Sequence, residues 1–207
     1  MAIISQIEIQ KRNKQRVNLY VDGEFYSGLQ LVAVVRLGLR EGAEVDEATL
    51  KEAVHQSEIS YAFEKCVDYL SKSMKTTKQI RDYLRKKGVV SEVEEIVVQK
   101  LKDYHYVDDQ LYFQLYTEQN SLSKGQRRIK NELMQKGIYK EMAEQVEVDD
   151  QKQRQTAVEL SQKYMKNKTN DFKTLQKLQR FLVYRGFDYD VVSQIIGQYR
   201  SGEDDWD

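Results

Sequence analysis

The chain has 207 residues, no proline and one cysteine, and its 33 basic residues balance 33 acidic ones. A single cysteine excludes an internal disulfide and a cysteine zinc site, and no stretch approaches the roughly 18 continuous apolar residues of a membrane helix. The lack of proline favours a nearly all-helical chain, because an interior proline costs a helix about 3 kcal/mol. We expect a cytoplasmic protein, since the first residues also lack the layout of a signal peptide.

Residues 1–28 have a different pattern from the rest of the chain. Isoleucines and valines alternate with polar residues, and Asp22-Gly23 interrupts this alternation. Alternation broken by Asp-Gly is typical of a hairpin. We therefore predict a small antiparallel β ribbon with turns around Asn13-Lys14 and Asp22-Gly23.

A short hairpin is marginally stable alone, so this ribbon needs support from another element. A helix from about Leu29 to Leu37 carries several apolar residues and would cover it. Asp46 would cap a second helix that ends near Glu58. A separate helix, from about Tyr61 to Ser71, would then open the first of three similar units.

An amphipathic segment that ends in glycine occurs three times in the rest of the chain. The copies are KQIRDYLRKKGV, GQRRIKNELMQKGI and QKLQRFLVYRGF, and their glycines, Gly88, Gly137 and Gly186, are spaced 49 residues apart. Five apolar positions recur at fixed distances from each glycine, and spacings of four put them on one helix face. These positions are Ile80, Ile129 and Leu178; Leu84, Leu133 and Leu182; Val89, Ile138 and Phe187; Val93, Met142 and Val191; and Val97, Val146 and Ile195.

The three glycines are predicted to end helices, because glycine adopts the left-handed conformation of a helix C-cap without penalty. Lysine or arginine precedes each of them, where cations meet the negative end of the helix. Another helix would follow each glycine. Ser91 would start it in the first unit, with Glu94 completing a capping box, and Asp188 would start it in the third. The alternative is that the glycines let the backbone approach a ligand.

These patterns define the expected fold class: mainly α, with tandem three-helix (helix-turn-helix-like) repeats in an elongated array and a small N-terminal β hairpin segment. Units of about 45–50 residues are in the range of helical repeats, which depend on their neighbours for stability. The expected parts are an N-terminal β ribbon with helices (1–58), three repeats (59–107, 108–152 and 153–201) and an acidic tail (202–207).

Charge is segregated along the chain, although it sums to zero. The helix before each glycine is basic, whereas acidic residues gather after the glycines and in the tail. Three basic helices at one period would attract nucleic acid or an acidic protein groove, although a single such helix is more often a solvated face. Arginine suits carboxylate and phosphate partners through its rigid fork. The candidate contact residues are Lys78, Arg81, Arg85, Arg127, Arg128, Lys130, Arg180 and Arg185.

Tyrosines suggest a second kind of contact, because aromatic rings stack on bases in single-strand binders. Tyrosine at helical spacing more often belongs to the core, with its hydroxyl at the rim, and we favour that interpretation. The residues concerned are Tyr104, Tyr106, Tyr112, Tyr116, Tyr184, Tyr189 and Tyr199.

No catalytic or metal site is predicted. His55 and His105 lack metal-ligand spacing, and the aspartate pairs at 108–109 and 149–150 are better explained as linkers and helix caps. Cys66 falls in an apolar column of the repeat, which indicates a buried thiol. We therefore expect no enzyme activity and no cofactor.

Three stretches resemble the RecX family, the bacterial regulators of the RecA recombinase. They are NLYVDGEFYSG (Asn18–Gly28), GQRRIKNELMQKGI (Gly125–Ile138) and FLVYRGFDYDVV (Phe181–Val192). The resemblance runs from about residue 5 to residue 200. Two features depart from it: Gln126 stands where many relatives have proline, and SKSMKTTKQ replaces a more arginine-rich stretch.

The resemblance implies a non-enzymatic regulator of DNA recombination, DNA repair and the SOS response. Such a protein would bind the RecA–single-stranded-DNA filament and inhibit RecA's recombinase, ATPase and co-protease activities. It would act as a monomer, without a membrane partner and with at most weak binding of single-stranded DNA. The alternative is a helix-turn-helix-type module that acts on DNA directly. Acids on the helix after each glycine argue against duplex recognition, because they repel phosphates.

Overall fold

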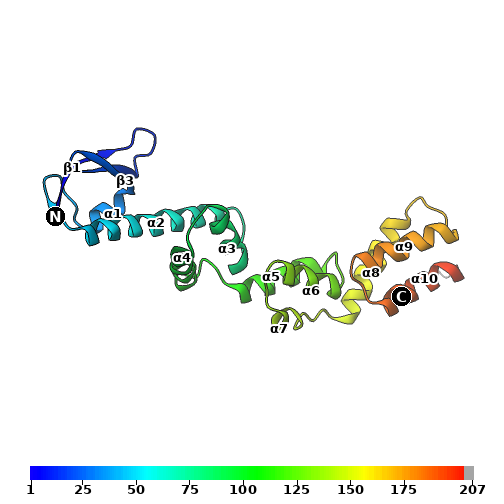
Figure 1. Ribbon diagram of the computed structural model, residues 1–207. Coiled ribbons are helices and arrows are strands. Elements are labelled where there is room, and N and C mark those ends of the chain that lie inside the picture. The colour runs from blue at the N-terminus through cyan, green and yellow to red at the C-terminus, as the bar shows by residue number, and fades with distance from the viewer. Residues whose placement is uncertain (203–207) are drawn as a thin grey trace. The chain divides into compact units, whose positions relative to one another are not determined.

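The computed structural model describes residues 1–202 and divides the chain into two compact units, one of Met1–Asp108 and one that begins at Asp109. Figure 1 shows an N-terminal group of strands followed by helices, which confirms a mainly α fold with a β segment at its start. The elements of the first unit are β1 (Ala2–Ile9), β2 (Arg16–Val21), β3 (Glu24–Gln30), α1 (Leu31–Arg36), β4 (Glu44–Val45), α2 (Glu47–Leu70), α3 (Thr77–Lys86) and α4 (Ser91–Asp103).

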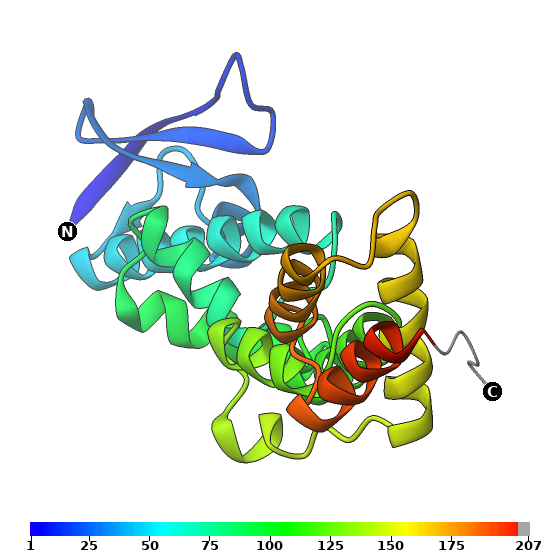
Figure 2. The same cartoon turned by 90° about the vertical axis from the view of Figure 1, so that its right-hand side faces the viewer.

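The second unit is helical throughout its described part. Its elements are α5 (Asp109–Ser121), α6 (Gln126–Gln135), α7 (Lys140–Ala143), α8 (Asp150–Met165), α9 (Phe172–Tyr184) and α10 (Tyr189–Ser201). Two hydrophobic cores form within it, one from α5 to α7 and the segment that follows, and one from α8 to α10. Figure 2 shows α9 and α10 packed side by side in the second of these cores.

The N-terminal strands form the predicted antiparallel ribbon. Its two hairpin turns lie between β1 and β2 and between β2 and β3, and both fall where the sequence indicated. Asp22 and Gly23 have φ values of +50° and +85°, as a tight two-residue hairpin turn requires. The sheet order is β3-β2-β1-β4, and the two-residue strand β4, which the sequence analysis missed, pairs with the start of β1.

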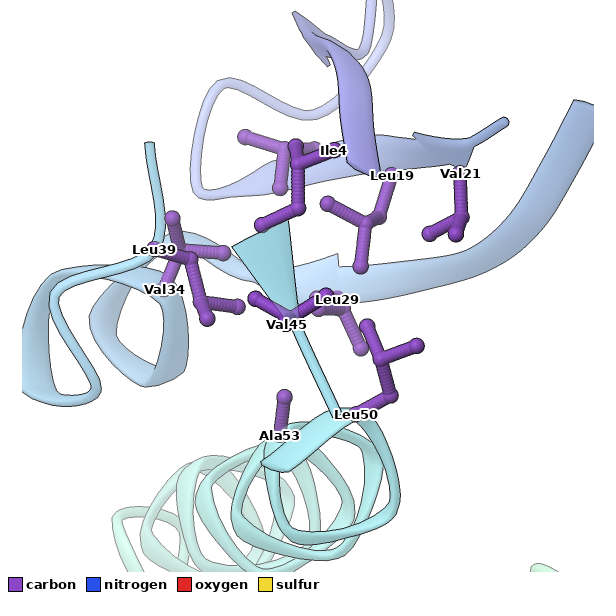
Figure 3. Close-up of a cluster of buried hydrophobic side chains, with 10 residues drawn as sticks. Ile4, Leu19, Val21, Leu29, Val34, Leu39, Val45, Leu50 and Ala53 are labelled. Carbon is purple, nitrogen blue, oxygen red and sulfur yellow. The ribbon is translucent and has the colours of Figure 1, made fainter. Parts of the chain in front are cut away.

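One face of the sheet is buried against α1 and α2. Alternate residues of β2, including Val17 and Leu19, are fully buried, as the two-residue period of a strand demands. Figure 3 shows Leu19 and Leu29 facing Leu50 and Ala53 of α2 across this core. The helices therefore provide the support that a short ribbon needs.

Helix α2 is one continuous helix of 24 residues, so the expected break between a helix ending at Glu58 and another starting at Tyr61 is wrong. No glycine or proline lies between these positions to stop it. Its first half packs against the sheet, whereas Ile59, Ala62 and Cys66 of its second half belong to the core with α3 and α4. A single helix thus joins the β segment to the first three-helix group.

The three glycines share one backbone conformation, as predicted. Gly88, Gly137 and Gly186 have φ values of +77°, +93° and +87°. In each case the next residue donates its N–H to the carbonyl oxygen of the leucine four positions before the glycine, over 3.1, 3.0 and 3.3 Å. This is the hydrogen bond of a glycine-ended helix, so the C-cap interpretation is confirmed. The apolar columns before the glycines are fully buried.

Two expectations about the helices after the glycines are wrong. In the second group, α7 has only four residues, and the next helix begins at Asp150 with Asp149 as its cap. Val146 is buried in the irregular segment between them. In the first group, Val90 rather than Ser91 occupies the N-cap of α4, and no side chain caps it. Asp188 does occupy the N-cap of α10, without a side-chain hydrogen bond.

Candidate partner-binding surface

Three basic side chains of α3 are engaged by carboxylates of the same unit. Lys78 pairs with Asp82 one turn later, at 2.8 Å, and both remain half exposed. Arg81 donates to Glu94 at 2.8 Å and also contacts Glu95, and Arg85 donates to Glu94 at 2.9 Å. These contacts cross the Gly88 turn and connect α3 to α4.

Glu94 is the centre of this arrangement, because its side chain is only 2% exposed. Burial raises the pKa of its carboxyl, but the hydrogen bonds from Arg85 and Arg81 outweigh burial and hold the pKa below its ordinary value. Glu94 therefore stays ionised between two guanidinium groups. The predicted capping box is absent, because Val90 at the N-cap has no side-chain acceptor and the Glu94 carboxylate pairs with the two arginines.

Glu132 plays a similar role on α6. It accepts hydrogen bonds from the Tyr116 hydroxyl at 2.6 Å, from the Lys124 ammonium at 2.5 Å and from Arg128 Nε at 2.8 Å. Burial alone would raise the pKa of this carboxyl, but the three donors lower it to about 2. Burial and the same hydrogen bond raise the pKa of the Tyr116 hydroxyl.

Arg128 and Arg185 join the two helical groups of the second unit. Arg128 Nη1 donates to the carbonyl oxygen of Tyr184 at 2.9 Å, and its guanidinium lies 4.4 Å from the centroid of the Tyr184 ring. Arg185 Nη1 donates to the carbonyl oxygen of Ser123 at 3.1 Å. The N–H of Gly125 donates to the carbonyl oxygen of Arg185 at 2.9 Å. Both arginines thus make contacts that hold the fold together.

Glycine is required on both sides of this junction. A Cβ on Gly125 would lie 2.2 Å from the carbonyl oxygen of Gly186, and a Cβ on Gly186 would lie 2.4 Å from Cβ of Arg128. Gly88, by contrast, has open space where its Cβ would be. The alternative reading of the glycines, a close approach of backbone, therefore applies at Gly186, but what approaches is the protein itself.

The remaining candidate cations are Lys130, Arg127 and Arg180, and their engagement differs. Lys130 is half-buried and lies 3.3 Å from Glu144, which is a weak pairing. Arg127 and Arg180 are exposed, and neither side chain forms an ion pair or hydrogen bond within residues 1–202. The eight candidates therefore divide into those engaged inside the protein and those with a free guanidinium.

The tyrosines divide in the same way. Tyr112 is buried, Tyr116 and Tyr199 are half-buried, and all three belong to the hydrophobic cores, as we expected. The core interpretation is wrong for the other four, which are exposed because their helix or turn positions face outward: Tyr104, Tyr106, Tyr184 and Tyr189. Tyr104 and Tyr106 nevertheless pack edge-on against Phe63.

A groove of about 420 Å³ lies between α6 and the end of α9. It is lined from α6 by Arg127, Arg128, Asn131 and Gln135, and from α9 by Val183 and Tyr184. The sequence analysis singled out the arginines and Tyr184 but missed the two amides. Their signal was available, since Arg127, Asn131 and Gln135 follow one another at intervals of four and share one helix face.

Cys66 and Asp149 have structural roles in this fold. Burial raises the pKa of the Cys66 thiol to about 12, so it is protonated, as expected for a core cysteine. Asp149 accepts a hydrogen bond from the N–H of Lys152 and caps α8, which confirms its predicted role. Within residues 1–202, no three potential metal ligands cluster, and no helix has the length and apolarity needed to cross a membrane.

The fold defines a helical-repeat protein with an N-terminal β segment. Family models for the regulatory protein RecX match its parts: the N-terminal domain at residues 2–46, the first three-helix domain at 62–101 and the third at 150–196. The chain belongs to the RecX family of regulatory proteins.

Relatives and solved structures agree with this assignment. The chain is 30% identical over 202 residues to regulatory protein RecX of Clostridium botulinum (strain Alaska E43), covering 95% of each chain. It is 35% identical to that of Bacillus cereus (strain AH820), covering 99% of this chain and 80% of the relative. A crystal structure of regulatory protein RecX matches with a TM-score of 0.69 at 28% identity, over 94% of this chain and 98% of that one. RecX from Lactobacillus salivarius matches with a TM-score of 0.60 at 27% identity, over 70% and 97%.

Proposed function

We propose that this protein binds the RecA–single-stranded-DNA filament and inhibits RecA's recombinase, ATPase and co-protease activities. Membership of a family of regulatory proteins supports a regulatory role. The observation that carries the proposal further is the recurrence of a basic, glycine-ended helix in three places, α3, α6 and α9. Several weak contacts on one chain add up through effective concentration, which suits a repetitive partner such as a filament.

The contact residues in this proposal are the cations that the fold leaves available. Arg127 and Arg180 are exposed and unengaged within the described chain, and Lys78 is exposed with a partner one turn away, a pairing worth little. Four other candidates instead support the fold: Arg81, Arg85, Arg128 and Arg185. Lys130 stands between the two classes, because its pairing with Glu144 is weak. In this proposal the protein acts as a monomer in the cytoplasm, where RecA acts. It binds without catalysing a reaction and without a cofactor.

Direct reading of duplex DNA receives less support. A helix-turn-helix module would place the helix after the glycine in the major groove. In the second group that helix, α7, has four residues, and in the first group it presents the exposed carboxylates of Glu92 and Glu95. A short or acidic helix is a poor reader of a groove lined by phosphates.

The test is the ATPase activity of RecA on single-stranded DNA, titrated with this protein. We expect hydrolysis to fall as the protein approaches stoichiometry with RecA. The double substitution Arg127→Glu with Arg180→Glu should shift the inhibition curve to roughly tenfold higher protein concentration, since each lost charge contact costs about 0.7 kcal/mol and about 1.4 kcal/mol is a factor of ten. Arg40→Glu removes an exposed charge outside the basic helices and serves as the control. Undiminished hydrolysis at stoichiometric wild-type protein would contradict the proposal.

A further inference from the structure

We propose that the groove between α6 and α9 is a binding subsite for nucleotides of a single-stranded nucleic acid, with Tyr184 as the stacking platform. The site requires no RecA and therefore stands apart from the filament-binding proposal. Nucleotide recognition needs a flat apolar face for the base, hydrogen-bonding groups for its edge and a cation for the phosphate. The groove holds all three.

The platform is Tyr184, whose residue surface is 72% exposed. One side of its ring is covered by the Arg128 guanidinium, 4.4 Å from the ring centroid. Arg128 is itself fixed by Glu132 at 2.8 Å and by the Tyr184 carbonyl oxygen at 2.9 Å, so the ring rests on an immobilised support. A base stacked on the open side would complete a base–tyrosine–arginine sandwich, in which the cation also attracts the ring electrons.

The polar groups are the row formed by Arg127, Asn131 and Gln135 on α6. All three are at least partly exposed, line the groove or its rim, and have side chains without hydrogen bonds or ion pairs in the described part of the chain. The two carboxamides each offer a donor and an acceptor, which is the complement of a base edge. Arg127 offers a charged fork to a phosphate.

The charge of the groove is also suitable. Its one carboxylate, Glu132, is saturated by Tyr116, Lys124 and Arg128, so it is neutralised by neighbours and does not face an incoming phosphate unpaired. A volume of about 420 Å³ falls within the range of sites for small organic groups, roughly 300–1,000 Å³.

An acidic peptide is the competing occupant, and the groove fits it less well. A row of carboxylates would require several unpaired cations. Among the residues that line the groove, only Arg127 is a cation without an ion pair. Two neutral amides and an open aromatic face contribute nothing specific to a carboxylate. A base, by contrast, hydrogen-bonds to amides and stacks on an aromatic ring. Such stacking is worth about 1–3 kcal/mol.

The experiment measures fluorescence anisotropy of labelled oligo(dT), about 15 nucleotides long, with the full-length protein and no RecA. Tyr184→Ala should weaken binding about tenfold, which corresponds to roughly 1.4 kcal/mol of lost stacking. Tyr184→Phe should bind like the wild type, because it keeps the ring. Tyr139→Ala is the matched control, since Tyr139 is 74% exposed but lies outside the groove.

Two further probes separate stacking from charge. An oligomer of the same length with abasic sites keeps every phosphate and should bind about as weakly to wild-type protein as oligo(dT) binds to Tyr184→Ala. Arg127→Gln should reduce the dependence of log affinity on log salt by about 0.7, the value for one phosphate of a single strand. A polyglutamate peptide of similar charge should compete poorly.

The proposal is overturned if Tyr184→Ala and Tyr139→Ala bind oligo(dT) equally well, or if the abasic oligomer binds as tightly as oligo(dT). It is also overturned if polyglutamate occupies the groove and oligo(dT) does not. Circular dichroism of each variant checks that the fold is retained. Inhibition of the RecA ATPase is measured separately with the same variants. A Tyr184→Ala protein that loses oligo(dT) but still inhibits RecA supports the subsite, and a wild type that binds oligo(dT) but never inhibits contradicts only the filament role.

Discussion

Ion pairing decides which basic side chains are engaged within the fold and which stay available for a partner. Lys78 and Asp82 could be paired from the sequence, because residues four apart share one helix face. Arg81 and Arg85 could not be matched with Glu94 in that way, since the contact crosses a turn between two helices. Candidate cations chosen from the sequence therefore include residues already paired with a carboxylate of the fold. Only the three-dimensional arrangement distinguishes these from unpaired cations.

Glu132 makes the stability of the second unit depend on pH. The pKa of its carboxyl is about 2 in the folded protein and 4.5 in an unperturbed glutamate. The folded pKa is the lower of the two, so the stabilisation is present above about pH 4.5 and is lost as pH falls toward 2. We expect the free energy of unfolding to drop by roughly 2 kcal/mol over this interval through Glu132 alone.

Urea denaturation between pH 5.5 and about 2.5 tests this prediction. Glu132→Gln should be less stable than the wild type at the upper end and should lose less stability on acidification. Glu144→Gln is the control, because that carboxylate is half exposed and makes only a long contact with Lys130. Parallel acid profiles for wild type and Glu132→Gln would show that the carboxylate does not act as described.

At the scale of the elements, the repeated glycines share a backbone conformation but differ in what surrounds them. All three require positive φ, which the sequence indicated through the basic residue before and the apolar residue after each glycine. Gly186 is also pressed against another helix, whereas Gly88 has open space where its Cβ would be. That difference depends on which neighbour each helix meets, and the period of 49 residues carries no information about it.

Replacing these glycines by alanine separates the two effects. Gly88→Ala has room for the methyl group and should cost about 1–2 kcal/mol, the penalty for a left-handed alanine. Gly186→Ala adds a collision with Arg128, so we expect a loss of roughly 2–5 kcal/mol. Chemical denaturation measures both. Equal losses at the two positions would show that the junction relaxes to accept a side chain.

The elements that sequence patterns failed to place are those whose ends depend on packing. The strand ribbon and the glycine-ended helices were predictable, because alternation, turn residues and spacings of four are local signals. The continuity of α2 was not, since the change from one core to the next leaves no local stop signal. The short length of α7 was not predictable either. The apolar residue Val146 suggested a longer helix, but it is buried without being helical. The groove at Tyr184 combines residues from two repeats, so the pattern of a single repeat could not predict it.

At the scale of the whole molecule, the first unit is expected to unfold as one body, because α2 contributes to both of its cores. A proline at Ser60, near the middle of α2, removes a backbone hydrogen bond and should cost about 3 kcal/mol or more. Amide hydrogen exchange should then accelerate in β2 and in α4 together. Glu47→Pro is the matched control, since proline is tolerated at the first helical residue. Faster exchange in only one of the two cores would contradict the coupling.

The contact between Gly125 and Gly186 also limits how this protein could be rebuilt from its own parts. Gly125 occupies the N-cap of α6, and the corresponding N-cap of α3 is Thr76, whose hydroxyl helps to start that helix. A chimaera with a copy of the first three-helix group in place of the second would bring a β-branched side chain to a spot where even one methyl group collides with backbone. The three-helix groups of this chain therefore share a pattern but cannot replace one another. The absence of a side chain at one contact position fixes which group can stand there.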